Sequence, residues 1–245
     1  MQKGKRNDYL SCDYPYFFIK KVEENLDCDA LFINGAIGGM SYHQYFWYPD
    51  GKPMSNTDTC AALGNHLGNV ANSIKNEKEL KPVFVVRNNK ITIPIQNIKF
   101  SMMMSDDVLT ADLVPDDTFE TGYALNTEVG YAQLDDTKIA LIPGEFFNEL
   151  AVGSAVVDDY FVHSDIPAES SVDEIFGKDC YRLIFSLSND EIGYILTERD
   201  FYLDPEEPFF ESPHDPKTGR SHYPETNSLG PKTGRCVTEG LKVIV

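Results

Sequence analysis

The chain has 245 residues, a net charge of −18 and 42% hydrophobic residues. This length can bury a large hydrophobic core, and the composition is that of a globular protein and not of a disordered one. So acidic a chain is repelled by phosphate groups, which excludes nucleic acid binding as a main role.

The first third of the chain predicts two helices and one strand. Apolar residues at helical spacing predict a helix over Tyr14–Leu26, with Asp13 as its N-cap. The short apolar run Ala30–Asn34 predicts a buried strand that enters the Gly-rich turn Gly35–Gly39. A second helix is expected over Cys60–Ile74.

The middle of the chain predicts paired strands. Pro82–Arg87 and Ile91–Ile95 are rich in β-branched residues and flank Asn88-Asn89, a pattern typical of a hairpin turn. Glu128–Gln133 and Lys138–Ile142 predict two further strands.

The C-terminal part predicts both kinds of element. A helix is expected to start within Phe146–Val152, and a buried strand is expected over Tyr181–Ser188. The acidic stretch Asp158–Lys178 suggests a surface loop, and Asp204–Pro231, rich in Pro, Gly and charge, suggests a second, long one. The last helix is expected over Thr233–Lys242.

The irregular alternation of strands and helices indicates an α/β fold, with a mixed β-sheet and flanking helices. Neither a repeat nor a linker is visible, which predicts a single domain over residues 1–245. No apolar stretch approaches the roughly 20 residues of a transmembrane helix, and no signal peptide is visible. The cellular compartment and the oligomeric state stay open.

Three predicted strands end in small-residue turns that carry, in chain order, Ser41, Glu145 and Tyr194. Ligands gather at strand ends because rigid strands hold the side chains that the turns expose. Glu145 suits a metal ligand or general base, and also a carboxylate that complements a helix N-terminus. Tyr194 is also compatible with a core or rim tyrosine. Ser41 lies outside any Gly-x-Ser-x-Gly elbow and is also compatible with a turn serine.

The chain has no self-contained zinc signature. Its five histidines form no His-x-His or His-Glu-x-x-His motif, and its five cysteines include no Cys-x-x-Cys pair. A zinc knuckle is therefore excluded, and any disulfide stays open. His222, which precedes Tyr223 in a predicted loop, is the best candidate among the histidines for a neighbour of a site.

The turns, in this order, resemble segments of the neutral/alkaline non-lysosomal ceramidases. The resemblance covers nearly the whole chain and is most specific over Glu128–Leu150. It begins at Leu10–Pro15 and includes Gly35–Ser41, Asn189–Ile195 and Tyr223–Pro231. Each motif alone is weak, whereas several in collinear order are fairly specific.

The resemblance implies a zinc-dependent amidohydrolase that cleaves the N-acyl bond of ceramide or a related N-acyl lipid. In this family two histidines, a glutamate and a tyrosine hold Zn²⁺, and the last two positions match Glu145 and Tyr194. The family's catalytic serine matches Ser41, and a second active-site tyrosine matches Tyr223. Zinc in such a site polarises the amide carbonyl and lowers the pKa of a bound water.

The chain departs from the family pattern in two ways. Gly39 stands where the family turn has an acidic residue. Both zinc histidines of the family lie upstream of anything that matches Met1, so the chain is expected to be the C-terminal portion of the catalytic domain. Zinc binding is then expected to be weak or absent, because half of the ligands are missing.

Three functions follow as alternatives. The first is ceramidase-like hydrolysis that is complete only when the missing N-terminal segment is supplied. The second is a degenerate, non-catalytic member of the family that binds a lipid, a glycan or a partner protein. The third is hydrolysis of a different amide or ester, with the aromatic stretch Tyr42–Tyr48 lining an acyl or sugar cleft or packing as a surface loop.

Overall fold

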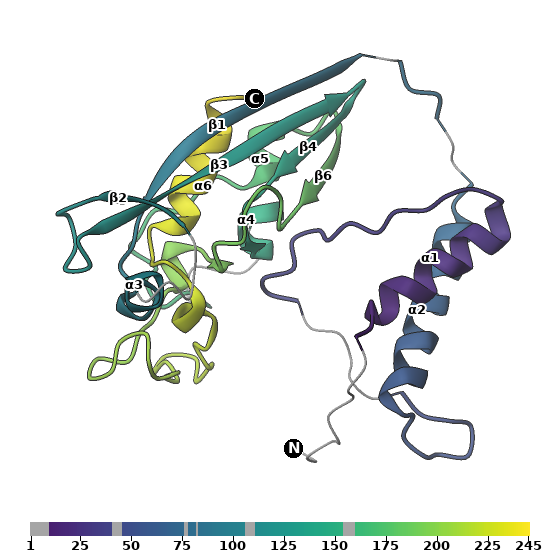
Figure 1. The fold of residues 1–245 in the computed structure, drawn as a ribbon, viewed down its shortest axis with the longest axis horizontal. Helices are drawn as coiled ribbons and strands as arrows, with labels where there is room; N and C mark the ends of the chain where they lie inside the picture. The colour runs from purple at the N-terminus through teal and green to yellow at the C-terminus, as the bar shows by residue number, and fades with distance from the viewer. Residues whose placement is uncertain (1–9, 41–45, 76–77, 82, 106–110, 154–159) are drawn as a thin grey trace. The chain divides into compact units, whose positions relative to one another are not determined.

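The computed structural model describes residues 10–40, 46–75, 78–81, 83–105, 111–153 and 160–245 (Figure 1). The chain divides into two compact units: unit 1 comprises Met1–Ile33 and Tyr42–Glu79, and unit 2 comprises Asn34–Ser41 and Leu80–Val245. The expectation of a single domain over residues 1–245 concerns how these units associate, and it stays a prediction.

Unit 1 is built on a pair of helices, α1 (Asp13–Leu26) and α2 (Asn56–Ser73). The two backbones approach closely at Gly64, where an added Cβ would lie 2.4 Å from the carbonyl oxygen of Tyr14. Both helices confirm the sequence prediction, although the N-cap of α1 is Cys12 and not Asp13.

The strand predicted over Ala30–Asn34 is wrong. These residues form no ladder, and Leu31 and Ile33 are 86% and 48% exposed. Phe32 instead packs edge-to-face on Tyr14 of α1, with ring centroids 5.6 Å apart. A short apolar run has too little periodicity to distinguish a strand from a loop that packs on a helix.

Unit 2 contains a five-stranded sheet. Along the sheet the strands are β1 (Phe84–Pro94), β3 (Tyr123–Leu134), β4 (Thr137–Leu141) and β6 (Tyr181–Phe185), with β2 (Asp112–Pro115) also paired to β3. The β4–β6 pair is parallel and the others are antiparallel. This mixed α/β architecture, a mostly antiparallel sheet flanked by helices, confirms the predicted fold class.

Helices pack on one face of this sheet (Figure 1). The α-helices of the described part of unit 2 are α3 (Ile98–Ser105), α4 (Asn148–Val152), α5 (Val172–Phe176) and α6 (Thr233–Lys242). α6 contacts β1 and β3, and its Val237 and Leu241 are fully buried against core residues such as Ile93 and Val129. Burial of this apolar face is the main term that stabilises a helix of this length.

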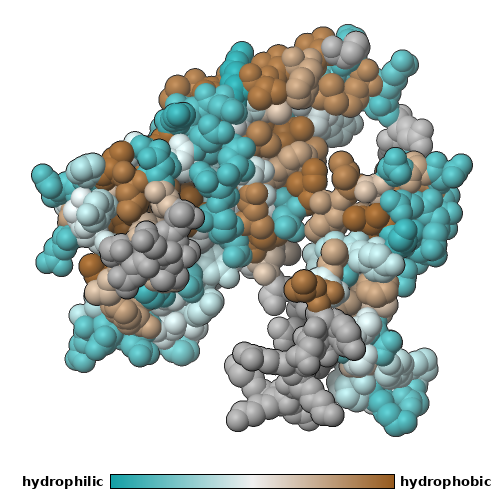
Figure 2. All heavy atoms as spheres, viewed as in Figure 1, coloured by the Kyte–Doolittle hydropathy of each residue, from teal (hydrophilic) through white to brown (hydrophobic). Residues whose placement is uncertain are grey.

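The other face of the sheet carries exposed apolar side chains. Phe84 and Val86 of β1 are 66% and 52% exposed, and Tyr181 and Leu183 of β6 are 62% and 46% exposed. Figure 2 shows hydrophobic residues gathered over this sheet. Side chains alternate between the faces of a strand, so these residues lie on the face opposite α6, and they are exposed among the described residues of unit 2. Within the described residues, no helix combines the length and apolar character needed to cross a bilayer.

The hairpin predicted at Asn88-Asn89 is wrong. β1 is one continuous strand, in which these residues pair with Gly130 and Val129 of β3. The side-chain amide of Asn89 donates to the carbonyl oxygen of Gly240 in α6 at 2.9 Å. A residue typical of turns can lie inside a strand when tertiary contacts satisfy its side chain.

The surface loop predicted over Asp158–Lys178 is wrong in part, because it contains α5. A capping box between Ser171 and Glu174 starts this helix, and Val172 and Phe176 are buried. Ser-x-x-Glu before an apolar residue was therefore a helix signal in the sequence.

Other predicted elements of unit 2 are confirmed in kind. Thr233–Lys242 is helix α6, and β3 and β4 are the two strands predicted before the Pro-Gly break. The strand predicted over Tyr181–Ser188 is the shorter β6. Phe146–Val152 starts as a strand before α4, and Asp204–Pro231 is irregular except for the 3-10 turn η3 (Pro224–Asn227).

Candidate functional site

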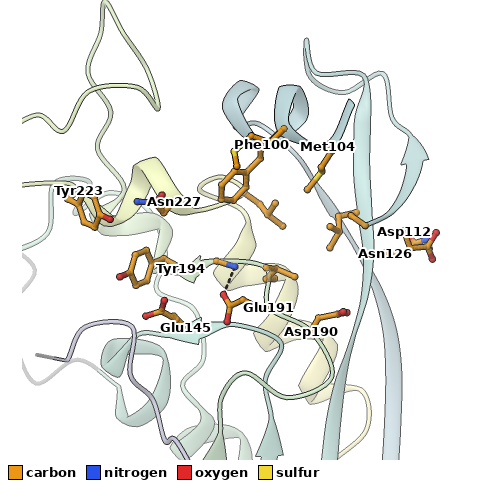
Figure 3. A pocket seen from close by; sticks show the side chains of 16 residues that line it. Phe100, Met104, Asp112, Asn126, Glu145, Asp190, Glu191, Tyr194, Tyr223 and Asn227 are labelled. Atoms are coloured by element: carbon orange, nitrogen blue, oxygen red, sulfur yellow. Dashed lines mark hydrogen bonds between the residues drawn. The ribbon is translucent and has the colours of Figure 1, made fainter. Parts of the chain in front are cut away.

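A two-stranded parallel sheet brings Glu145 and Tyr194 side by side. Its strands are β5 (Glu145–Phe146) and β7 (Tyr194–Ile195), and Glu145 is in register with Tyr194. The backbone N–H of Glu145 donates to the carbonyl oxygen of Gly193 at 3.0 Å. Residues in register project from the same face, and Figure 3 shows the carboxylate and the phenol extending in the same direction.

Two glycines allow close backbone contacts at these strands, one between the strands and one with η3. A Cβ at Gly144 would lie 2.6 Å from the carbonyl oxygen of Gly193. Gly193 has a φ of +87°, and a Cβ there would lie 2.3 Å from the carbonyl oxygen of Asn227. Both the positive φ and the close backbone contact require glycine, which explains the Gly-Tyr sequence at the start of β7.

Gly193→Ala is expected to lower the free energy of unfolding by at least about 2 kcal/mol, because backbone strain and a forced shift of Asn227 add. Gly122→Ala is the matched control: Gly122 has a φ of +72°, and an added Cβ there meets no atom within 4 Å. Urea denaturation of the two variants separates the effects. Equal destabilisation of both would contradict the importance of the close approach at Gly193.

The Gly-rich turn before Ser41 docks on β5. The N–H of Gly38 donates to the carbonyl oxygen of Phe146 at 2.9 Å, and a Cβ at Gly38 would lie 2.3 Å from the carbonyl oxygen of Glu145. This turn therefore reaches the strand that carries Glu145. Ser41 itself lies outside the described residues, and its catalytic role stays a prediction.

Tyr223 is the N-cap residue of η3, and its ring belongs to a group of three aromatic rings in contact. Its ring meets that of Tyr194 edge-to-face with centroids 6.5 Å apart, and Phe147 contacts Tyr194 from another side at 5.9 Å. Within the described residues, neither the hydroxyl of Tyr194 nor that of Tyr223 makes a hydrogen bond, so both are available to a ligand.

Glu145, Tyr194 and Tyr223 line a cavity of about 430 Å³ (Figure 3), a volume typical of small-molecule sites. Its acidic residues are Asp112, Glu145, Asp190 and Glu191. Its apolar residues include Phe100, Met103, Met104, Leu125, Ile192 and Leu229. No lysine, arginine or histidine is among the described residues that line it.

The cavity shifts the pKa of several of these groups. Burial raises the pKa of Glu145. Burial also raises the pKa of Glu191, the N–H of Gly193 lowers it through a 2.9 Å hydrogen bond, and the charge of Glu145 raises it. Burial and then the charge of Glu145 raise the pKa of Tyr194. Tyr194 is therefore a neutral phenol at pH 7, able to donate a hydrogen bond.

The described residues do not fit a zinc ion by themselves. Among them, no group of three or more His, Cys, Asp or Glu side chains is placed to hold a metal. Glu145 and Tyr194 offer one carboxylate and one phenol, whereas a catalytic zinc takes three protein ligands. The predicted zinc ligation by these two residues stays a prediction.

His222 is not among the described residues that line the cavity. The imidazole is 3% exposed, with Nδ1 2.5 Å from Oε1 of Glu225 and Nε2 3.1 Å from Oδ2 of Asp215. Burial lowers the pKa of His222, but the two carboxylates raise it by more, so the net pKa is raised. His222 thus supports the loop that carries Tyr223.

No protein-family model matches the chain, and no curated protein sequence matches it. Among solved structures, the chain is similar to the crystal structure of neutral ceramidase from Pseudomonas aeruginosa, with a TM-score of 0.58 and 12% sequence identity. The match covers 97% of this chain and 40% of that one, so the chain spans two fifths of the length of that protein. At 12% identity this likeness establishes the fold alone. It therefore supports the resemblance noted in the sequence as a resemblance of fold.

Sequence reasoning found Glu145, Tyr194 and Tyr223 but missed the rest of the cavity. Glu191 lies in the same turn as Tyr194 and has no pattern of its own. The wall from α3 was missed because its segment has no clear periodicity. The run Met102–Met104 was the available signal, since methionine is common on adaptable binding surfaces.

Proposed function

We propose that this site belongs to a ceramidase-like amidohydrolase, which cleaves the N-acyl bond of ceramide or a related N-acyl lipid. One observation carries the proposal. Because Glu145 of β5 is in register with Tyr194 of β7, the carboxylate and the phenol line the same cavity. Neither group makes a side-chain hydrogen bond within the described part of the chain. The likeness of the fold to neutral ceramidase supports the same reaction class.

In this proposal, residues of the chain itself bind the substrate and stabilise the charge that develops on it. The phenol of Tyr223 donates a hydrogen bond to the amide oxygen as that oxygen gains negative charge. Ser41 keeps the catalytic role that the resemblance implies. The apolar wall, which includes Phe100 and Met104, binds hydrocarbon and keeps water away from the reacting bond. A phenol suits this role because its O–H group donates a hydrogen bond.

Zinc, when bound, would supply Lewis-acid activation of the amide carbonyl and of water. We assign Glu145 and Tyr194 as the ligands from this chain. Because two ligands are too few, the 245 residues alone are expected to bind Zn²⁺ weakly or not at all, with imidazoles from additional polypeptide completing the centre.

Free imidazole in solution can stand in for the missing ligands. Hydrolysis of a fluorescent N-acyl lipid by the chain is expected to rise when Zn²⁺ and imidazole are added together, more than with either alone. A chelator is expected to abolish the increase. Absence of hydrolysis under all of these conditions would overturn the proposed function, and hydrolysis that resists the chelator would overturn its zinc dependence.

The alternative of a non-catalytic binding protein is not favoured by any of these observations. Its signature in the same experiment would be lipid binding without hydrolysis.

A further inference from the structure

A fully buried asparagine, Asn97, connects two segments that line the cavity. It lies directly before α3, and it is 0% exposed. Phe100 of α3 lines the cavity, as do Tyr223 and Asn227 of the segment that forms η3 (Figure 3). A buried amide is costly unless hydrogen bonds satisfy it, so the partners of Asn97 show which segments it holds together.

One end of the Asn97 side chain caps α3. Its Oδ1 accepts hydrogen bonds from the backbone N–H groups of Lys99 at 3.1 Å and Phe100 at 3.4 Å. The first N–H groups of a helix have no partner within the helix, and an asparagine before the first turn satisfies them. This cap therefore fixes the start of the helix that carries the apolar wall.

The other end of the side chain holds η3. Nδ2 of Asn97 donates to the carbonyl oxygens of Thr226 at 3.3 Å and Ser228 at 2.8 Å. The backbone N–H and the hydroxyl of Thr226 in turn donate to the carbonyl oxygen of Tyr223, at 3.1 and 2.8 Å. The backbone of Tyr223 is thus tied to Asn97 through Thr226.

The phenol of Tyr223 depends on this backbone support. Its residue is 56% exposed, and its ring meets that of Tyr194 edge-to-face, with centroids 6.5 Å apart. A half-exposed side chain has few packing contacts of its own to fix its position. A hydrogen bond that stabilises charge in a transition state requires precise placement of the donor, and a shift of about 1 Å is enough to weaken catalysis strongly.

We propose that Asn97 is a positioning residue for the proposed reaction, which places the phenol of Tyr223 by bracing η3 against α3. The proposal rests on the proposed function, because that function assigns the hydroxyl of Tyr223 its contact with the amide oxygen. Asn97 does not touch the substrate. It acts on the reaction through Tyr223.

Substitution of Asn97 by serine separates the brace from the helix cap. Serine caps a helix about as well as asparagine, but it has no Nδ2 group and is too short to reach η3. Asn97→Ser is expected to lower the hydrolysis stimulated by zinc and imidazole about tenfold per folded molecule.

Asn89→Ser is the matched control for this substitution. Nδ2 of Asn89 likewise donates to a carbonyl oxygen of a neighbouring element, that of Gly240 at 2.9 Å. Asn89 is not among the described residues that line the cavity. The control loses the same kind of hydrogen bond and is expected to keep the rate per folded molecule.

A double-mutant cycle distinguishes positioning from a general effect on the fold. Tyr223→Phe keeps the ring, removes the hydroxyl and is expected to lower the rate at least about tenfold. In the Tyr223→Phe chain, Asn97→Ser is expected to lower the rate by less than about a further twofold, because the group that it positions is already absent. A residue that serves only the fold would cost the same factor in both chains.

Hydrogen exchange measures the brace without catalysis. The backbone N–H of Ser228 donates to the carbonyl oxygen of Glu225 at 3.2 Å, and that of Ser101 in α3 donates to the carbonyl oxygen of Asn97 at 3.2 Å. In Asn97→Ser the amide of Ser228 is expected to exchange at least about tenfold faster than in Asn89→Ser, with the amide of Ser101 unchanged.

A second variant carries the same tests if Asn97→Ser does not fold. Aspartate has the shape of asparagine and keeps the Oδ1 acceptor for α3, but its ionised carboxylate has no donor for the two carbonyl oxygens. Asn97→Asp is therefore expected to lower the rate and to speed exchange at Ser228 in the same way.

Three results would overturn the proposal: a wild-type rate for the Asn97 variant, an equal loss of rate in the wild-type and Tyr223→Phe chains, or exchange at Ser228 no faster than in Asn89→Ser. A failure of the proposed function is visible separately. If the wild type hydrolyses no amide but Ser228 exchanges faster in Asn97→Ser, the reaction is removed and the bracing of η3 by Asn97 remains.

Discussion

Replacing His222 with phenylalanine is expected to lower the free energy of unfolding by about 3–5 kcal/mol. The imidazole separates two carboxylates whose side chains are almost inaccessible, with Asp215 0% and Glu225 2% exposed. Phenylalanine keeps a ring in this space but has no N–H groups, so Glu225 would lose the donor to its Oε1, and the two buried carboxylates would lose the imidazole charge that separates them.

The loss is expected to reach the cavity, because this cluster organises the loop that carries Tyr223. Asp215 accepts hydrogen bonds from the backbone N–H groups of Lys217 at 2.9 Å and Thr218 at 2.6 Å. Arg220 makes two hydrogen bonds to the carboxylate of Asp200, at 2.6 and 2.8 Å. Side-chain contacts thus hold a long segment that has little secondary structure.

The stabilisation by His222 has a defined pH window. The pKa of His222 is raised above its ordinary value of 6.5, so its contribution is full below that pH and is lost as pH rises through the folded pKa. Burial raises the pKa of Asp215, but hydrogen bonds from Thr218 and His222 lower it by more. The contribution of Asp215 is therefore present above its ordinary pKa of 3.8 and is lost in stronger acid.

Urea denaturation at several pH values measures this effect. The difference between the wild type and His222→Phe is expected to be largest between about pH 4 and 6.5. His66→Phe is the control, because His66 is exposed on α2 and is expected to show little change at any pH. A His222→Phe difference that is independent of pH would mean that the charge of the imidazole does not stabilise the fold.

Elements with strong local signals could be predicted from the sequence. α6 has its apolar residues on one face, and β3 and β4 flank a short polar turn. The errors have one physical cause, which is that long-range contacts override local preference. Asn88-Asn89 stays in a strand because β3 and α6 satisfy it, whereas Ala30–Asn34 forms no ladder with the described residues and packs its Phe32 on Tyr14 instead.

The candidate site, too, has parts with a local sequence signal and parts that depend on long-range contacts. Glu145 and Tyr194 could be singled out because each follows a Gly residue after an apolar strand. Their pairing depends on β5 and β7, strands of two residues each, which are too short to carry a periodic pattern. The cavity wall formed by α3 comes from a distant segment of the chain. Only the folded structure therefore shows that its apolar side chains and Glu191 line the same cavity.

Glu145→Gln is expected to lower the hydrolysis stimulated by zinc and imidazole at least about 100-fold. Glutamine has nearly the same shape as glutamate but no negative charge, so it binds a cation poorly and cannot accept a proton from water. The pairing of β5 with β7 should persist, because the backbone N–H of Glu145 and not its side chain donates to Gly193.

Stability distinguishes a chemical role from a structural one. Burial makes the ionised form of Glu145 unfavourable in the folded state, since it raises the pKa of Glu145. Glu145→Gln removes this cost and should leave the free energy of unfolding at pH 7 unchanged or slightly higher. Glu149→Gln, on α4 and outside the cavity, is the matched control and should retain the rate. A variant at Glu145 that loses rate and stability together would show that the carboxylate serves the fold, because a group kept for its chemistry is expected to destabilise the protein that carries it.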